Sequence, residues 1–182
     1  RDNKITKRWY GTRIKPIRYI KSFNKGRTTC HLGHVKILNK FLKSNSKYAL
    51  IFEDDINIDS NYNEISNKIN YIVNNVPKDA DIVYLSYCFE ICSKLKNTND
   101  IFIKAYRPLC RHFYLVTKSG AEKIIKYTLP MFSSGDRMIG ELIKNKLLNG
   151  FTVNPKFLNI QQDRNEMFKT TLDNKINHRL CM

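Results

Sequence analysis

The 182-residue sequence has few acidic residues for its number of basic ones. Sixteen Asp and Glu stand against 32 Lys and Arg, which gives a formal net charge of +16. Such an excess favours an anionic partner, whether nucleic acid, acidic glycan, phosphate or membrane. Long apolar runs are also absent: no stretch approaches the roughly 18–20 apolar residues that span a bilayer, and the polar, basic segment 1–16 is unlike a signal peptide. We therefore expect neither a membrane span nor a signal peptide in this chain.

The cysteines are too few and too irregular for a disulfide scaffold. Their number is odd, which argues against the framework of a small secreted protein. No second Cys pair or nearby His completes a tetrahedral zinc site with Cys88 and Cys92. We expect buried free thiols and a reducing compartment such as the cytoplasm. The five cysteines are Cys30, Cys88, Cys92, Cys110 and Cys181.

The composition is that of one folded domain over residues 1–182. Hydrophobic residues make up 42% and charged residues 26%, which excludes disorder along the whole chain. Continuous apolar runs at 48–52, 81–85, 113–116 and 151–153 predict strands, and the first two are typical of strands buried on both faces. Helices are expected at 31–44, at 60–76, after a capping box formed by Ser119 and Glu122, and at 136–148, ending in a left-handed cap at Asn149-Gly150. This alternation predicts an α/β sheet flanked by helices, with ligands at the carboxyl ends of its strands.

Three acids follow the first predicted strand directly: Glu53, Asp54 and Asp55. If the segment is extended, Glu53 and Asp55 aim at one point and Asp54 faces elsewhere. Oxygen ligands on a short turn suit Mg²⁺ or Mn²⁺, although a solvated acidic turn is the alternative. In a strongly positive protein, a cation held there suits a diphosphate such as that of a nucleotide sugar, where it acts as a Lewis acid.

Several segments together resemble glycosyltransferase family 25. Residues 26–34 (Gly-Arg-Thr-Thr-Cys-His-Leu-Gly-His), a helix, and then 48–55 ending in Glu-Asp-Asp are similar to its signature, roughly Gly-Glu-x-Gly-Cys-x-x-Ser-His, helix, apolar strand and Glu-Asp-Asp. Residues 81–85 and 113–124 resemble later family segments in the same order. Asp136 stands where the family carries Pro-(Val/Ile)-Asp. The resemblance covers residues 25–162.

The resemblance implies a GT-A-like (Rossmann-like) mixed α/β sheet flanked by helices. The family's first strand would precede Arg1, so we expect it either to lie outside this sequence or to be absent from the protein. It also implies a UDP-linked donor, dependence on Mn²⁺ (or Mg²⁺) and an inverting displacement. Glu53, Asp54 and Asp55 would form the DxD-like motif. Combined with the alternation above, this makes Asp55 the first metal contact and Glu53 the second.

Three further residues take roles from the resemblance. Asp136 is the candidate base that removes a proton from the acceptor hydroxyl; its alternative is a helix N-cap. His34 would bind donor phosphate or orient an acidic ligand, or else be a structural histidine. Gln162 would lie near the donor. A basic group before the strand at 113 would neutralise the diphosphate or belong to the basic surface, and comprises Arg107, Arg111 and His112.

The sequence thus predicts transfer of a hexose, galactose or glucose, from a UDP-sugar to a hydroxyl of a glycan or of a collagen-like protein. One alternative is a catalytically silent transferase-like domain. Another is a basic nucleic-acid-binding protein, disfavoured because the basic residues are dispersed and no helix-turn-helix, OB or RRM signature is present. A Mg²⁺-dependent nuclease or phosphatase ranks lower, since no second acidic cluster is evident. The oligomeric state is not indicated.

Overall fold

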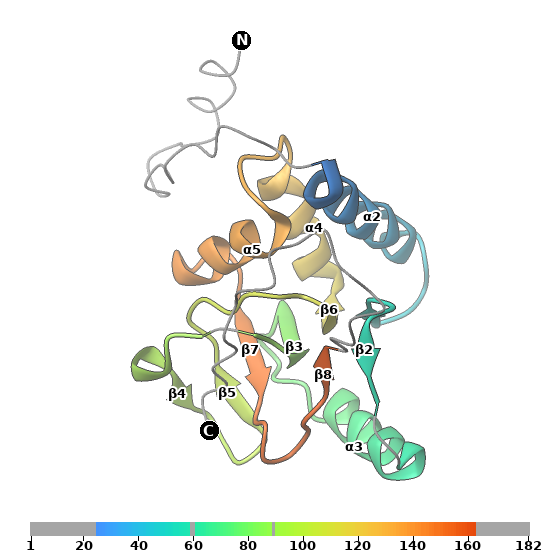
Figure 1. Cartoon of the computed structure of the whole chain (residues 1–182), viewed down its shortest axis with the longest axis vertical. Coiled ribbons are helices and arrows are strands. Elements are labelled where there is room, and N and C mark those ends of the chain that lie inside the picture. The colour runs from blue at the N-terminus through green and yellow to red at the C-terminus, as the bar shows by residue number, and fades with distance from the viewer. Residues whose placement is uncertain (1–24, 59–60, 89, 163–182) are drawn as a thin grey trace.

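A six-stranded mixed sheet forms the centre of the molecule (Figure 1). The computed structural model describes residues 25–58, 61–88 and 90–162. Strands β3 and β7 are parallel and the other neighbouring pairs are antiparallel. Since β1 and β3 both run antiparallel to β6, strands β1, β3 and β7 run in the same direction. Their carboxyl ends lie along one side of the sheet, which we call the carboxyl edge. The strand order is β1 (Tyr48–Phe52), β6 (Phe113–Thr117), β3 (Ile82–Ser86), β7 (Gly150–Val153), β5 (Phe102–Lys104) and β4 (Lys96–Asn97).

Helices cover both faces of this sheet. Helices α2 (Lys25–Leu42), α4 (Lys118–Thr128) and α5 (Gly135–Lys144) contact one another, as Figure 1 shows. Their apolar residues pack with Ile82 and Tyr84 of β3, whereas Ile72 of α3 (Tyr62–Asn74) belongs to a second cluster with Val83 and Leu85. Alternate residues of a strand point to opposite faces, so β3 serves both clusters. The expected mixed α/β sheet flanked by helices is confirmed.

The two strands expected to be buried on both faces differ. All five residues of β3 are buried, as predicted. In β1 only Ile51 is buried and Phe52 is 62% exposed, because β1 is an edge strand of the described sheet. An apolar run does not distinguish a central strand from an edge strand, and the prediction for β1 was wrong for that reason.

Helix boundaries also depart from the prediction. Helix α2 begins at Lys25 rather than at residue 31. The cap of α4 is Thr117, whose hydroxyl accepts from the backbone N–H of Gly120, so the predicted Ser119 cap is wrong. Helix α5 ends at Lys144, and Lys146, not Gly150, has a positive φ of 59°. Gly150 instead begins β7, where a Cβ would overlap the side chain of Ile143.

The prediction of free thiols is wrong for two cysteines. Cys88 and Cys110 form a disulfide that links the segment after β3 to the segment before β6. Because disulfides persist mainly in oxidising compartments, cysteine usage no longer supports a reducing one. Cys30 is free and exposed. No helix among the described residues has the length and apolar character needed to cross a bilayer. The signal-peptide prediction concerns residues 1–16, which lie outside the described residues.

Candidate functional site

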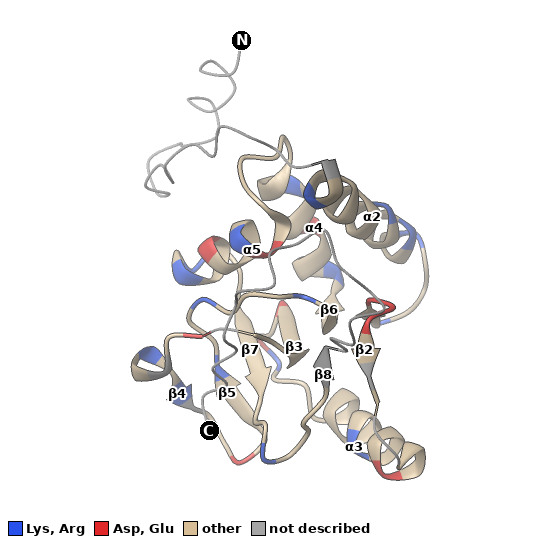
Figure 2. Ribbon diagram, viewed as in Figure 1, with Lys and Arg blue, Asp and Glu red and all other residues tan. Residues whose placement is uncertain are grey.

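The acidic turn lies at the edge where β1, β3 and β7 end. It leads from β1 to the short strand β2 (Ile56–Asn57), and Figure 2 shows acidic residues in red next to β2. The backbone N–H of Glu53 donates to the carbonyl of His112, 2.8 Å away, which joins the turn to the start of β6. Glu53 and Asp55 are half-buried and Asp54 is exposed. The segment is a turn rather than an extended strand, so simple alternation is not the cause of this difference.

Glu53 is oriented by a histidine from helix α2. His34 Nε2 lies 2.8 Å from Glu53 Oε1, and His34 Nδ1 lies 2.9 Å from the hydroxyl of Tyr114. A carboxylate only accepts, so Nε2 carries the proton and Nδ1 accepts from the Tyr114 hydroxyl. This geometry fits the role of orienting an acidic ligand, one of the two functional roles expected for His34. Donor binding by His34 stays a prediction.

The charges of this pair follow from their surroundings. Burial lowers the pKa of His34, and the hydrogen bond to Glu53 only partly opposes it. Burial acts to raise the pKa of Glu53, but the hydrogen bond from His34 and nearby positive charge outweigh it, so this pKa is lowered. At neutral pH a neutral imidazole therefore donates to an ionised carboxylate.

A buried arginine lies beside this pair. Arg111 is 4% exposed, so the expectation that it belongs to the basic surface is wrong. Its Nη1 donates to His31 Nδ1 at 3.0 Å and its Nη2 to Cys30 Sγ at 3.7 Å. Within the described ranges, no carboxylate approaches its guanidinium within 4.0 Å. Burial, followed by the charge of Arg111, lowers the pKa of His31 to about 3, so this histidine is neutral.

Helix α5 brings Asp136 to the same place. Asp136 is in the first turn of α5, whose N-cap is Ser134, so the alternative of an Asp136 cap is wrong. Gly135 is packed so closely that a Cβ would overlap the guanidinium of Arg111 and lie 2.7 Å from His31 Nδ1. The charge of Asp136 acts on the pKa of His31, opposing its decrease. The predicted base thus starts a helix held against the Arg111–His31 pair.

The last predicted donor residue reaches the acidic turn through its backbone. Strand β8 (Gln161–Gln162) pairs antiparallel with β2, and Gln162 stands opposite Ile56, the residue after Asp55. This pairing brings two segments about a hundred residues apart in sequence to one site. A donor contact by Gln162 stays a prediction.

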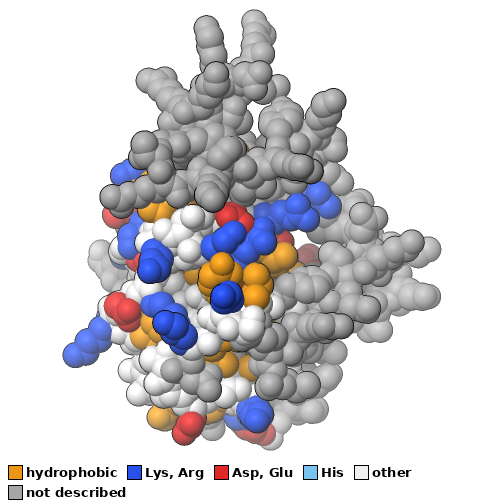
Figure 3. Space-filling view, turned by 90° about the vertical axis from the view of Figure 1, so that its left-hand side faces the viewer, with side chains coloured by type: hydrophobic (Ala, Val, Ile, Leu, Met, Phe, Trp, Pro, Cys, Tyr) orange, Lys and Arg blue, Asp and Glu red, His pale blue; other side chains and the backbone are white. Residues whose placement is uncertain are grey.

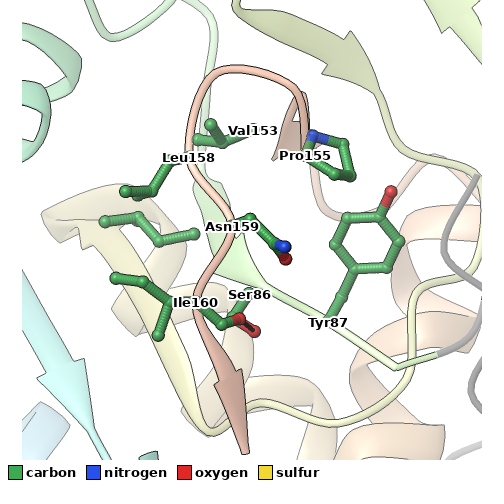
Figure 4. A pocket seen from close by; sticks show the side chains of 8 residues that line it. Ser86, Tyr87, Val153, Pro155, Leu158, Asn159 and Ile160 are labelled. Carbon is green, nitrogen blue, oxygen red and sulfur yellow. Dashed lines mark hydrogen bonds between the residues drawn. The ribbon is translucent and has the colours of Figure 1, made fainter. Parts of the chain in front are cut away.

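A small pocket lies beyond the ends of β3 and β7 (Figure 4). Its cavity volume is about 10 Å³, which is room for about one water molecule. Ser86 connects it to the acidic turn: its hydroxyl lies 2.6 Å from His112 Nε2 and donates to the carbonyl of Ile160. The pocket does not enclose a whole nucleotide sugar. Its lining includes Leu85, Ser86, Tyr87, Val153, Leu158 and Ile160.

Comparison with known families decides the class of protein. A model of glycosyltransferase family 25 (LPS biosynthesis protein) matches residues 4–139. The chain belongs to glycosyltransferase family 25. No curated protein matches it. The family match includes helix α2, the acidic turn and Asp136, and ends before β7, so Gln162 lies outside it.

Glycosyltransferases of family 25 commonly use a divalent metal, and the acidic turn fits one. Carboxylate oxygens on a short turn are the hard donors that Mn²⁺ and Mg²⁺ prefer. Glu53 is ionised and Asp55 remains half-buried rather than enclosed in the core. Asp55 and Glu53 would hold the ion, which when bound would neutralise phosphate oxygens.

Sequence reasoning missed the polar groups that organise the family 25 site. Tyr114 was interpreted only as part of a strand, and His31 was not singled out. The two histidines are three residues apart on α2 and therefore on one helical face, the only local signal available. Their partners Tyr114 and Arg111 are each 80 residues away.

Proposed function

We propose that this family 25 chain moves a hexose, galactose or glucose, from a UDP-sugar to a hydroxyl of a glycan or a collagen-like acceptor. The reaction would invert the anomeric carbon and require Mn²⁺ or Mg²⁺, on a GT-A-like fold. The observation that carries the proposal is the convergence at one sheet edge of the ionised Glu53, the buried Arg111 and the first turn of α5.

In this proposal the acidic turn binds the donor. Asp55 and Glu53 would hold the cation, which when bound would supply Lewis-acid stabilisation to the departing diphosphate. His34 keeps the Glu53 carboxylate in one orientation through a 2.8 Å hydrogen bond. Asp54, which is exposed, and Gln162, whose strand pairs beside the turn, contribute further donor contacts. The positive charge of Arg111 favours a phosphate-bearing ligand at this edge.

Asp136 supplies the base. Its carboxylate takes the proton of the acceptor hydroxyl while that oxygen bonds to the anomeric carbon and the UDP oxygen leaves with the bonding electron pair. A carboxylate is basic enough because the hydroxyl loses its proton only as the new bond forms. Attack opposite to the leaving group gives the inverted anomer.

A glycan-binding domain without transferase activity is a second candidate, favoured by the small pocket. Nucleic-acid binding has less support, because the basic residues are dispersed along the sequence; on the face shown in Figure 3, Lys and Arg side chains lie next to hydrophobic ones. The salt dependence of binding to random oligonucleotides, compared with that of UDP, separates nucleic-acid binding from the other two.

The deciding experiment is a calorimetric screen of UDP, GDP and CMP, each with and without Mn²⁺. We expect Mn²⁺-dependent binding of UDP and hydrolysis of UDP-hexose, both lost in Asp55→Ala. Asp100→Ala, at an exposed acid on another loop, is the matched control. UDP binding without hydrolysis or transfer would favour the silent domain, and no affinity for any nucleotide would overturn the proposal.

A further inference from the structure

Cys30, His34 and Glu53 form a cluster of three different metal-ligating side chains. Cys30 and His34 are four residues apart on α2 and so share one face of the helix, which is turned toward the end of β1. One ligand atom from each of the three residues lies within 4.8 Å of the other two. Glu53 Oε1 is the common point, 2.8 Å from His34 Nε2 and 3.6 Å from Cys30 Sγ.

These separations are close to those of a tetrahedral metal site. With Zn–S of about 2.3 Å and Zn–N and Zn–O of about 2.0–2.2 Å, neighbouring ligand atoms lie about 3.3–3.6 Å apart. The sulfur–oxygen distance of 3.6 Å already matches, and the nitrogen–oxygen distance of 2.8 Å has to open by about half an ångström.

The surroundings fit a site of this kind. When Nε2 binds the ion, Nδ1 carries the ring proton and donates it to the Tyr114 hydroxyl, 2.9 Å away, as metal-bound histidines donate to their outer-shell partners. Arg111 Nη2 donates to Cys30 Sγ, and its positive charge opposes the rise in the pKa of this thiol that burial causes. Cys30 is exposed among the described residues, so an ion can approach its sulfur from solvent.

We propose that Cys30, His34 and Glu53 bind a zinc-type divalent cation, at a site distinct from the Mn²⁺ or Mg²⁺ site proposed at Asp55. The donor set decides the metal: one sulfur, one imidazole nitrogen and one carboxylate oxygen suit Zn²⁺, whereas Mn²⁺ and Mg²⁺ prefer oxygen alone. Three protein ligands leave a fourth position for water or a substrate atom. Glu53 is shared with the proposed donor site, so the two proposals need separate readouts.

Cobalt titration of the full chain tests the proposal. The protein is freed of metal with a chelator and kept without thiol reductant, so that the Cys88–Cys110 disulfide stays closed and supplies no competing thiolate. We expect one equivalent of Co²⁺ to produce a thiolate-to-cobalt charge-transfer band in the near ultraviolet, and Zn²⁺ to displace it. Cys30→Ala should abolish the band, and Cys92→Ala, which leaves all three proposed ligands in place, should retain it.

Two further variants sharpen the result. His34→Gln should weaken Co²⁺ binding at least tenfold; because His34 is buried, its melting curve is compared with that of the unaltered chain. Asp55→Asn should keep the Cys30-dependent band while losing Mn²⁺-dependent UDP binding. Absence of the band, or an equal band in Cys30→Ala, overturns the zinc site and leaves the donor proposal standing. A Cys30-dependent band without any UDP binding does the reverse.

Discussion

A buried acid, Asp81, and a half-buried acid, Glu53, lie at opposite ends of the sheet's strands and have very different surroundings. Asp81, just before β3, is 3% exposed and accepts from Lys123 Nζ at 2.6 Å, from Ser119 Oγ at 2.9 Å and from the backbone N–H of Asn149 at 2.8 Å. Glu53, just after β1, has a neutral imidazole and a thiol as its hydrogen-bond partners.

The difference separates a structural acid from one that is available to a ligand. Asp81 is paired with the full positive charge of Lys123 and accepts two further hydrogen bonds. Its burial therefore joins β3, α4 and the segment before β7. Glu53 stays ionised with partners that do not cancel its charge, so a cation at this edge gains a Coulombic partner. Substitutions at the carboxyl edge, around Glu53, should therefore alter activity. Substitutions at the opposite edge, around Asp81, should alter stability.

The largest effect is expected at the carboxyl edge, for Asp136→Asn. Loss of the base should lower kcat by about 10²- to 10⁴-fold, because proton removal from the acceptor is no longer assisted. UDP–Mn²⁺ affinity and the free energy of unfolding should stay nearly constant, since Asn preserves the shape of the first turn of α5. The measurements are transfer kinetics and calorimetry. Loss of UDP binding as well would refute the role of Asp136 as base.

The second largest effect is expected at the opposite edge, on stability. Asp81→Asn should lower the free energy of unfolding by about 1–3 kcal/mol, because Lys123 loses its partner and the buried hydrogen bonds weaken. Urea denaturation measures this change. The same chemical substitution at the carboxyl edge, Asp55→Asn, is the control. It should lower the free energy of unfolding by less than about 1 kcal/mol. Equal destabilisation by the two variants would break the comparison.

The carboxyl edge should also make the stability of the protein depend on pH. Burial, with the charge of Arg111, lowers the pKa of His31 to about 3, against an ordinary value of 6.5. Between these values the unfolded chain binds the additional proton, so stability is complete above pH 6.5 and decreases as the pH falls toward 3. The contribution between pH 7.5 and 5 is about 1–2 kcal/mol. Urea denaturation in a chelator should show a flatter pH profile for His31→Gln; an unchanged profile would contradict a buried neutral His31.

The smallest effect tests the orientation of His34. Tyr114→Phe removes the hydroxyl that donates to His34 Nδ1 but keeps the ring, and should lower stability by about 0.5–1.5 kcal/mol. UDP–Mn²⁺ affinity should fall by less than about tenfold. Tyr84→Phe is the matched control, because the buried Tyr84 hydroxyl has no hydrogen-bond partner among the described residues. An equal or larger loss in the control would show that removal of a buried hydroxyl, rather than loss of the hydrogen bond to His34, is being measured.

Much of the fold was predictable from local pattern. Apolar runs marked β1, β3, β6 and β7, and their alternation with amphipathic segments predicted a mixed sheet with helices on its faces. The position of Glu53 at a strand end followed directly from those runs. Helix ends were less predictable, since Ser119 and Thr117 are both good caps and contact with Asp81 selected between them.

The sequence by itself determined the strands, the class of fold and the acidic turn at the end of one strand, because these depend on neighbouring residues and on their apolar pattern. Only the tertiary structure decided that β1 is an edge strand and that Cys88 meets Cys110. It also decided that His34 meets Tyr114 and that Arg111 meets His31. Such pairings join residues 22 to 80 positions apart and leave no periodic trace in the chain. They arise when burial of the whole core forces each polar group to find a partner.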